Sequence, residues 1–190
     1  MYQNFNILKP APYKKRLQEL RTILKKKKLH GFLIPRADLY QNEYIEPRDS
    51  RLEWITGFTG SAGLCLVTLK SAFIFVDGRY QVQVKKEINA KLFRIILTSE
   101  VSFVTWFKKY CKDQIIGYDP WLHTISEIEK LAGEKGFKLK IRKCSNLIDK
   151  IWAQKPSRIS QSLEVHPKKF SGITSKIKRK QISAKLISNG

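Results

Sequence analysis

Apolar residues recur at helical spacing near the start of the chain. The segment 13–28 carries four of them on one side: Leu17, Leu20, Ile23 and Leu24. This pattern predicts an amphipathic helix whose apolar stripe faces a core. We expect His30 and Gly31 to end the helix, with Gly31 in the left-handed conformation that often follows one. The run GFLIP at 31–35 then predicts a short buried strand that Pro35 ends.

Strand and helix patterns continue to alternate as far as residue 154. Two β-rich runs, 64–69 and 72–78, are separated by Lys70 and Ser71 and predict a hairpin. The segment 51–58 fits a short helical turn or a strand, and 79–88 fits a short helix although its alternation also suits a strand. Further helices are predicted at 101–111, 123–136 and 146–154, and further strands at 91–97, 114–120 and 137–143.

Two helix starts carry capping signals. Thr124 with Glu127 three residues later forms a capping box, Gly136 can end the helix that follows, and Asn146 is a good N-cap for the next one. Because strands alternate with helices, the pattern predicts an α/β fold with a mixed sheet and flanking helices.

The pattern changes after residue 155. We predict one domain at 1–155, a linker with little periodicity at 156–171, and a single helix at 172–190. This last helix has no following strand on which to pack, so we interpret it as the opening of a second domain that the sequence cuts short.

The net charge of +21 raises the question of nucleic-acid binding, because clustered Lys and Arg release counterions from phosphate. The lysines are spread over nearly every segment, however, and only 25–28 and 176–180 are concentrated runs. No zinc finger, helix-turn-helix or RNP-like aromatic pattern accompanies them. We therefore favour a solvated basic surface, with nucleic-acid binding as an alternative.

Other features of the composition favour a cytoplasmic protein. No apolar run is long enough to cross a bilayer, and residues 1–20 lack the pattern of a secretory signal. Cys65, Cys111 and Cys144 are widely separated, an odd number without metal-site spacing, so we expect reduced and buried thiols.

The sequence holds no set of residues that could build a complete active site. His30, His123 and His166 lack metal-ligand spacing. Ser61 stands in GSAG, but Thr59 occupies the place where a nucleophile elbow needs glycine, and a strand follows instead of a helix. We predict no catalytic and no metal-binding residue, and no cofactor, in this chain.

Two segments nevertheless stand out. The long polar loop at 36–50 carries Tyr40 and Tyr44, and long loops in compact domains are often functional. The tetrapeptide Asp77-Gly78-Arg79-Tyr80 ends an apolar strand. We expect Asp77 and Arg79 to form a buried or half-buried pair that fixes the turn.

Six segments occur in an order that resembles a known family. They are GFLIPRAD (31–38), NEY (42–44), RLEWITGFTGSAG (51–63), FVDGRY (75–80), GYDPWLHT (117–124) and NLIDKIWAQKP (146–156). Together they resemble the N-terminal region of the three-domain Xaa-Pro aminopeptidases (aminopeptidase P) of the creatinase/prolidase superfamily.

This resemblance implies a creatinase-like N-terminal domain, a second domain of similar fold and a C-terminal "pita-bread" catalytic domain. That catalytic domain would hold two metal ions, usually manganese, through Asp, Asp, His, Glu and Glu, and would remove an N-terminal residue that precedes proline. All of these ligands would lie beyond residue 190, so the resemblance implies an inactive supporting domain.

The resemblance also implies a role for this domain in dimer contacts and in the wall of the substrate channel. The candidates for those contacts are Tyr44, Arg51, Asp77, Arg79 and Tyr80. A stand-alone interaction module that has kept the fold and lost the enzyme is the alternative, ahead of a nucleic-acid binder.

Overall fold

A computed structural model describes residues 12–133, 140–160 and 162–189. The chain divides into two compact units, 1–157 and 158–190. Among the described residues, all six strands lie in the first unit, and the second unit contains two helices and segments without regular structure.

The first unit is built on a six-stranded sheet with the order β4-β3-β2-β1-β5-β6. The strands are β1 (Gly31–Pro35), β2 (Leu64–Thr68), β3 (Ala72–Val76), β4 (Arg94–Leu97), β5 (Ile115–Tyr118) and β6 (Lys140–Lys143). Strand β2 runs antiparallel to both of its neighbours, whereas β3 with β4, β1 with β5, and β5 with β6 are parallel pairs. The predicted hairpin is therefore β2–β3, and the mixed α/β sheet is confirmed.

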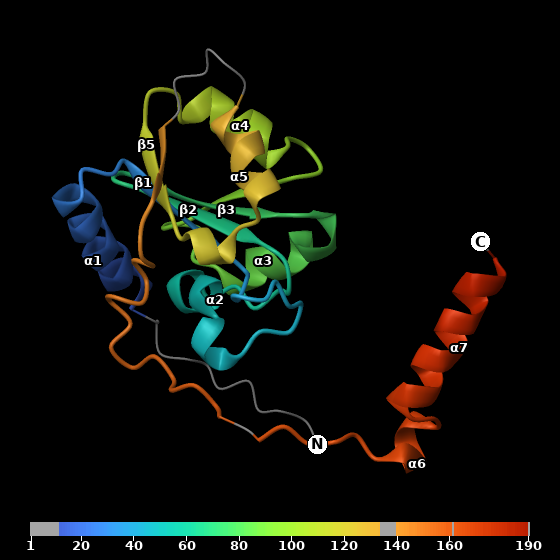
Figure 1. The fold of residues 1–190 in the computed structure, drawn as a ribbon. Coiled ribbons are helices and arrows are strands. Elements are labelled where there is room, and N and C mark those ends of the chain that lie inside the picture. Colours follow the sequence, from blue (N-terminus) through green and yellow to red (C-terminus); the bar gives the residue numbers. More distant parts are fainter. Residues whose placement is uncertain (1–11, 134–139, 161, 190) are drawn as a thin grey trace. The chain divides into compact units, whose positions relative to one another are not determined.

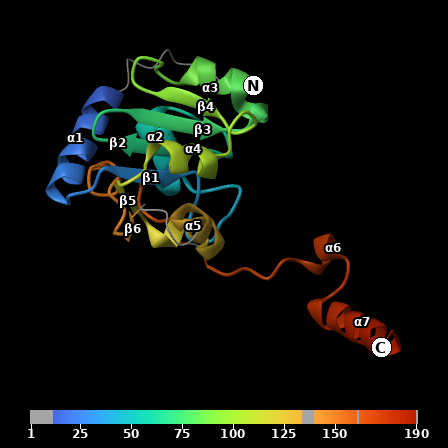
Figure 2. The same ribbon diagram turned by 90° about the horizontal axis from the view of Figure 1, so that it is seen from above.

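Helices cover both faces of this sheet (Figures 1 and 2). They are α1 (Tyr13–Lys26), α2 (Arg51–Thr56), α3 (Gln81–Glu87), α4 (Phe103–Tyr110) and α5 (Ile125–Ala132), with short 3-10 turns at Pro47–Asp49, Gly78–Tyr80 and Pro120–Leu122. The segments 51–58 and 79–88, which fitted either a helix or a strand, both contain helices. Helices α1, α2 and α3 share one hydrophobic cluster, and α4 and α5 share the other.

Alternation along the central strands separates the two clusters. In β1, Phe32 and Ile34 belong to the cluster under α1 to α3, while Leu33 between them belongs to the cluster under α4 and α5. Strand β2 repeats this with Cys65 and Leu66 on opposite faces. Since each fully buried large apolar side chain contributes about 1.5–3 kcal/mol, these interleaved positions fix the register of the sheet.

The end of α1 differs from the prediction. The helix ends at Lys26, and Lys28 takes the left-handed conformation with φ 52°. The amides of Leu29 and Lys28 bond to the carbonyls of Leu24 and Lys25 at 2.9 and 3.1 Å, which is the Schellman pattern, and Leu24 and Leu29 are both buried beside it. Gly31 instead begins β1, where an added Cβ would lie 3.0 Å from the carbonyl oxygen of Val67. Close strand packing, not a helix cap, therefore accounts for this glycine.

The capping box before α5 is confirmed, since Thr124 and Glu127 exchange both hydrogen bonds. The end of α5 differs: the helix stops at Ala132, and Gly133 follows with φ 78°. The expected end at Gly136, and the first part of the strand predicted at 137–143, lie outside the described residues.

The helix predicted at 146–154 is wrong, because this segment forms successive turns. The side chain of Asn146 accepts hydrogen bonds from the amides of Ile148 and Asp149 at 3.0 and 3.4 Å. Asparagine can close a turn in this way as readily as it caps a helix. Leu147 and Ile148 are fully buried, so the apolar residues of this segment anchor it in the core and do not form the face of a helix.

The second unit contains α6 (Lys168–Ser171) and α7 (Ser175–Ser188). Thr174 caps α7 by accepting a hydrogen bond from the amide of Ile177 at 3.4 Å. A helix therefore occupies most of the range 172–190, and α6 is an additional helical turn within the predicted linker. The role of α7 as the start of a second domain stays a prediction.

Candidate functional site

The corner after β3 is formed by Asp77, Arg79 and Tyr80. The carboxylate of Asp77 accepts hydrogen bonds from the backbone amide of Arg79 at 2.9 Å and from its Nε and Nη2 at 3.1 and 2.9 Å. The predicted pair therefore exists, but its burial differs between the two residues: the Asp77 side chain is 36% exposed and Asp77 is half-buried, whereas the Arg79 side chain is 70% exposed, contrary to the prediction. The hydrogen bond from Arg79 lowers the pKa of Asp77, which favours the ionised pair.

Tyr80 joins this corner to the glycine-containing turn before β2. Its hydroxyl lies 2.7 Å from Oγ of Ser61, and its ring packs edge-on against Phe58 at 5.6 Å. The Arg79 guanidinium lies 5.3 Å from the centre of the same ring. The turn is tight, since a Cβ added to Gly60 would lie 2.2 Å from Cζ of Phe58. Ser61 thus acts as a turn residue that holds the corner.

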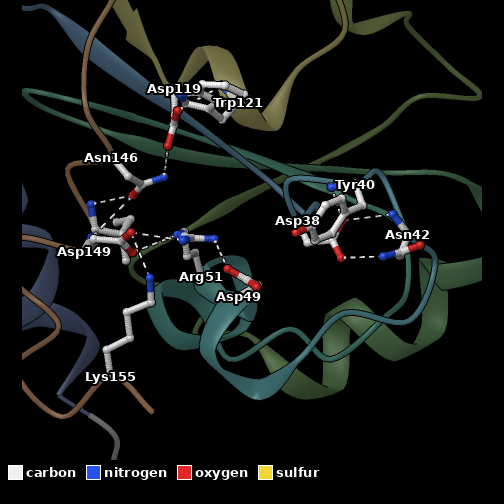
Figure 3. A network of polar contacts seen from close by, with 11 residues as sticks. Asp38, Tyr40, Asn42, Asp49, Arg51, Asp119, Trp121, Asn146, Asp149 and Lys155 are labelled. Atoms are coloured by element: carbon white, nitrogen blue, oxygen red, sulfur yellow. Dashed lines mark hydrogen bonds and ion pairs between the residues drawn. The ribbon is translucent and has the colours of Figure 1, made fainter. Parts of the chain in front are cut away.

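The loop at 36–50 is organised around Asp38, which is 6% exposed (Figure 3). Its carboxylate accepts bonds from the amides of Tyr40 and Asn42 at 2.9 and 3.0 Å and from Nδ2 of Asn42 at 2.9 Å. Burial alone would raise the pKa of Asp38, but these hydrogen bonds outweigh it and lower the pKa. The loop is therefore a shaped turn that presents Tyr44, 87% exposed, to solvent.

Four of the five candidate residues lie in these two segments. The carboxylate of Asp77 is the main cause of the raised pKa of Arg79. The structure gathers Asp77, Arg79 and Tyr80 at one corner and carries Tyr44 separately, on the loop at 36–50.

Arg51 occupies a different environment, inside a buried ion network at the start of α2 (Figure 3). Its Nε and Nη2 bond to the two carboxylate oxygens of Asp149 at 2.8 and 3.0 Å, and its Nη1 bonds to Asp49 at 2.8 Å. Lys155 contacts Asp149 from the other side at 2.8 Å. Because the Arg51 side chain is only 7% exposed, this arrangement favours an anchor that fixes the end of the loop.

Two further contacts, besides the ion network around Asp149, hold the segment 146–155 in place. Nδ2 of Asn146 bonds to the carboxylate of Asp119 at 3.1 Å, as Figure 3 shows. Trp152 stacks on Trp54 of α2 with ring centres 5.3 Å apart. Asp149 was not among the predicted site residues, although an acidic residue close to the apolar side chains of Leu147, Ile148 and Ile151 is a signal that a buried cation can face it.

The described residues offer surfaces for contact and no reactive centre. None of them form a group of three or more His, Cys, Asp or Glu side chains that could hold a metal ion. The three cysteines are free, and Cys144 is only partly buried, which differs from the expectation for that thiol. Burial raises the pKa of Cys65 and Cys111, which disfavours the reactive thiolate. Among the residues that the structure describes, none of the helices has the length and hydrophobicity that a bilayer crossing requires.

Comparison with known proteins identifies the family of this fold. Residues 16–151 match the model of the Creatinase/Prolidase N-terminal domain. The chain belongs to this family.

The more specific similarity is to the N-terminal part of Xaa-Pro aminopeptidases, which confirms the resemblance seen in the sequence. Aminopeptidase P1 of Lotus japonicus is 33% identical over 163 residues, which cover 84% of this chain and 25% of the relative. A probable Xaa-Pro aminopeptidase P of Penicillium rubens is 33% identical over 180 residues, covering 90% of this chain and 29% of the relative. The chain thus spans about a quarter of the length of these curated relatives.

Solved structures show the same fold. The X-prolyl aminopeptidase of Caenorhabditis elegans, described as a cytosolic enzyme with a di-nuclear active site, superposes with a TM-score of 0.80 at 23% identity and covers 93% of this chain and 31% of its own. The N-terminal domain of the cytoplasmic peptidase PepQ from Mycobacterium tuberculosis superposes with a TM-score of 0.56 at 20% identity, covering 72% of this chain and 98% of its own.

Proposed function

We propose that this chain is the non-catalytic N-terminal domain of a metal-dependent Xaa-Pro aminopeptidase. The proposal rests on the match of residues 16–151 to the N-terminal domain family and on alignments that cover only about a quarter of the aminopeptidase relatives. We assign the two metal ions, manganese by the resemblance, to the part of such an enzyme that this chain does not cover. The described residues provide no ligand set that fits them.

Within that enzyme we assign this domain to dimer contacts and to the wall of the substrate channel, in a cytoplasmic protein. Exposed aromatic side chains on the loop at 36–50 support this, since Tyr40 and Tyr44 are 71% and 87% exposed. Tyrosine is enriched at interfaces because its ring buries a large apolar area while its hydroxyl can hydrogen-bond. At the corner after β3, Arg79 offers a guanidinium that is 70% exposed and paired with Asp77. A cation of this kind can bind a peptide carboxylate.

The channel assignment is tested in the product of the complete reading frame that contains this segment. Tyr44→Ala and Arg79→Met should each raise KM for an Xaa-Pro peptide, or shift the dimer–monomer equilibrium in analytical ultracentrifugation, while leaving Tm unchanged. Tyr110→Ala is the matched control, because Tyr110 is an exposed tyrosine on α4 at 54% exposure. If both variants behave like this control in both assays, the channel and dimer roles are wrong.

A further inference from the structure

A cavity of about 280 Å³ lies within the first unit, between the end of β1, the start of β2 and the helices α4 and α5. Much of its wall is apolar and comes from Leu64, Phe103, Val104, Leu122 and Leu131. Arg36, His123 and Lys130 add polar groups to the same wall. This volume is about that of nine water molecules in the liquid, at about 30 Å³ each. A small ligand therefore fits, and a drug-sized one does not.

Two residues in the wall of this cavity each carry a buried polar atom without a hydrogen-bond partner. Among the described residues, the buried side-chain nitrogen and oxygen atoms without a hydrogen-bond partner are Nη1 of Arg36 and Nε2 of His123. Both residues line this cavity, although they come from distant parts of the chain. A buried polar atom left unpaired is costly, so each such atom in a folded protein calls for a partner such as a ligand or water.

Each side chain makes a contact that holds part of it in place. Nε of Arg36 donates to the carbonyl of Gly60 at 3.1 Å, and its backbone amide donates to Gly63 at 2.9 Å. The ring of His123 packs edge-on against Tyr118 at 5.8 Å. Burial lowers the pKa of His123, so its imidazole is neutral near pH 7 and keeps a single N–H. The unpaired groups thus belong to a cationic guanidinium and a neutral imidazole.

The charges around the cavity favour an anion. Arg36 Nη1 can only donate, and Lys130 adds a second positive charge. Glu127, whose carboxylate accepts the amide of Thr124 at 2.8 Å in the capping box, also lines the cavity, so the wall carries two positive side chains and one negative one. An inorganic anion would satisfy Arg36 and leave the apolar wall in contact with water.

We propose that this cavity binds a small carboxylate with a compact apolar body, its carboxylate on Arg36 and His123 and its body against the leucines. This site goes beyond the proposed function and does not depend on it. Such a ligand satisfies the unpaired donor with a charge-assisted hydrogen bond and buries apolar surface in one step.

The test is calorimetry and NMR on the 190-residue chain with three probes: 4-methylpentanoate, its uncharged amide and inorganic phosphate. We expect the carboxylate to bind and to shift the ring signals of His123 while those of His166 stay unchanged. The amide should bind at least tenfold more weakly. No binding of the carboxylate at millimolar concentration, equal binding of the amide, or an equal effect of phosphate would each overturn the proposal.

Variants separate the site from general effects on the fold. Arg36→Met should weaken carboxylate binding about tenfold or more, a difference of about 1.4 kcal/mol. Arg142→Met is the matched control, since this arginine on β6 does not line the cavity and bonds through Nη1 to the carbonyl of Lys27 at 3.0 Å. Ala62→Leu leaves Arg36 in place and fills the cavity, so it should abolish binding even if Arg36→Met does not fold. A folded Ala62→Leu chain that still binds the carboxylate would refute this location for the site.

Discussion

Replacing Arg51 with methionine should destabilise the first unit strongly, although the change retains most of the side-chain volume. The guanidinium is 7% exposed and makes three hydrogen bonds, at 2.8, 2.8 and 3.0 Å, to the carboxylates of Asp149 and Asp49. Methionine removes the charge and leaves Asp149 and Asp49 partly buried without their main partner. The loss of folding stability therefore comes mainly from the carboxylates left without a positive partner and not from a cavity.

The size of the effect follows from the burial of the groups left behind. Removing one partner of a buried ion pair costs about 3–5 kcal/mol. Asp149 is 32% exposed and keeps Lys155 at 2.8 Å, which places the expected loss near the lower end, about 3 kcal/mol. A unit of this size loses about 2–4 °C in Tm for each kcal/mol, so the melting temperature should fall by about 6–12 °C.

Thermal unfolding followed by tryptophan fluorescence is the suitable assay, because Trp54 and Trp152 stack beside this network. Arg79→Met is the matched control: the same residue type also binds an aspartate, but its side chain is 70% exposed. We expect no measurable change in Tm for the control, since exposed pairs contribute little. A Tm of Arg51→Met within about 1 °C of the parent chain, or an equal fall in Tm for both variants, would refute a stabilising role of the Arg51 network.

Three further predictions concern acid, packing and thiols. Burial would raise the pKa of Asp149, but the hydrogen bonds from Arg51 and Lys155 outweigh it and lower the pKa. The ionised carboxylate therefore stabilises the fold above about pH 4, and this stabilisation is lost as the pH falls through the lowered pKa. The free energy of unfolding should accordingly depend less steeply on acid pH in Arg51→Met. Gly60→Ala should lower Tm because the new Cβ would lie 2.2 Å from Phe58, whereas Gly78→Ala, with nothing within 4 Å, should not; equal Tm values would contradict the tight turn. Cys65, fully buried, should react with a thiol reagent only after denaturation, and rapid labelling in the native chain would show that this face of the sheet opens.

The elements that the sequence predicted well carry a clear hydrophobic pattern. The hairpin and the first strand follow from short apolar runs, because each strand divides its residues between two cores and is buried on both faces. The segment 146–154 was misread because Leu147, Ile148, Ile151 and Trp152 also fit helical spacing. The side chain of Asn146 closes a turn in place of the helix, and tertiary contacts hold the segment in this form. Hydrophobic periodicity carries no information about such contacts.

The candidate residues were harder to predict for the same reason. Asp77 and Arg79 are separated by a single residue, so their pairing could be expected, but their exposure depends on what surrounds the corner. Arg51 and Asp149 are 98 positions apart, and no local pattern joins them. Arg36 follows β1 and His123 precedes α5, and the two residues line the same cavity only in the folded chain.

The central claim, that this chain is the supporting domain of an Xaa-Pro aminopeptidase, is tested most directly by one activity measurement. Hydrolysis of an Xaa-Pro peptide with added manganese should be compared between the 190-residue chain and the product of its complete reading frame. We predict that the chain alone stays at the level of a sample without protein and that the complete product releases the residue before proline. Turnover by the chain alone, or a complete product without this activity, would contradict the account.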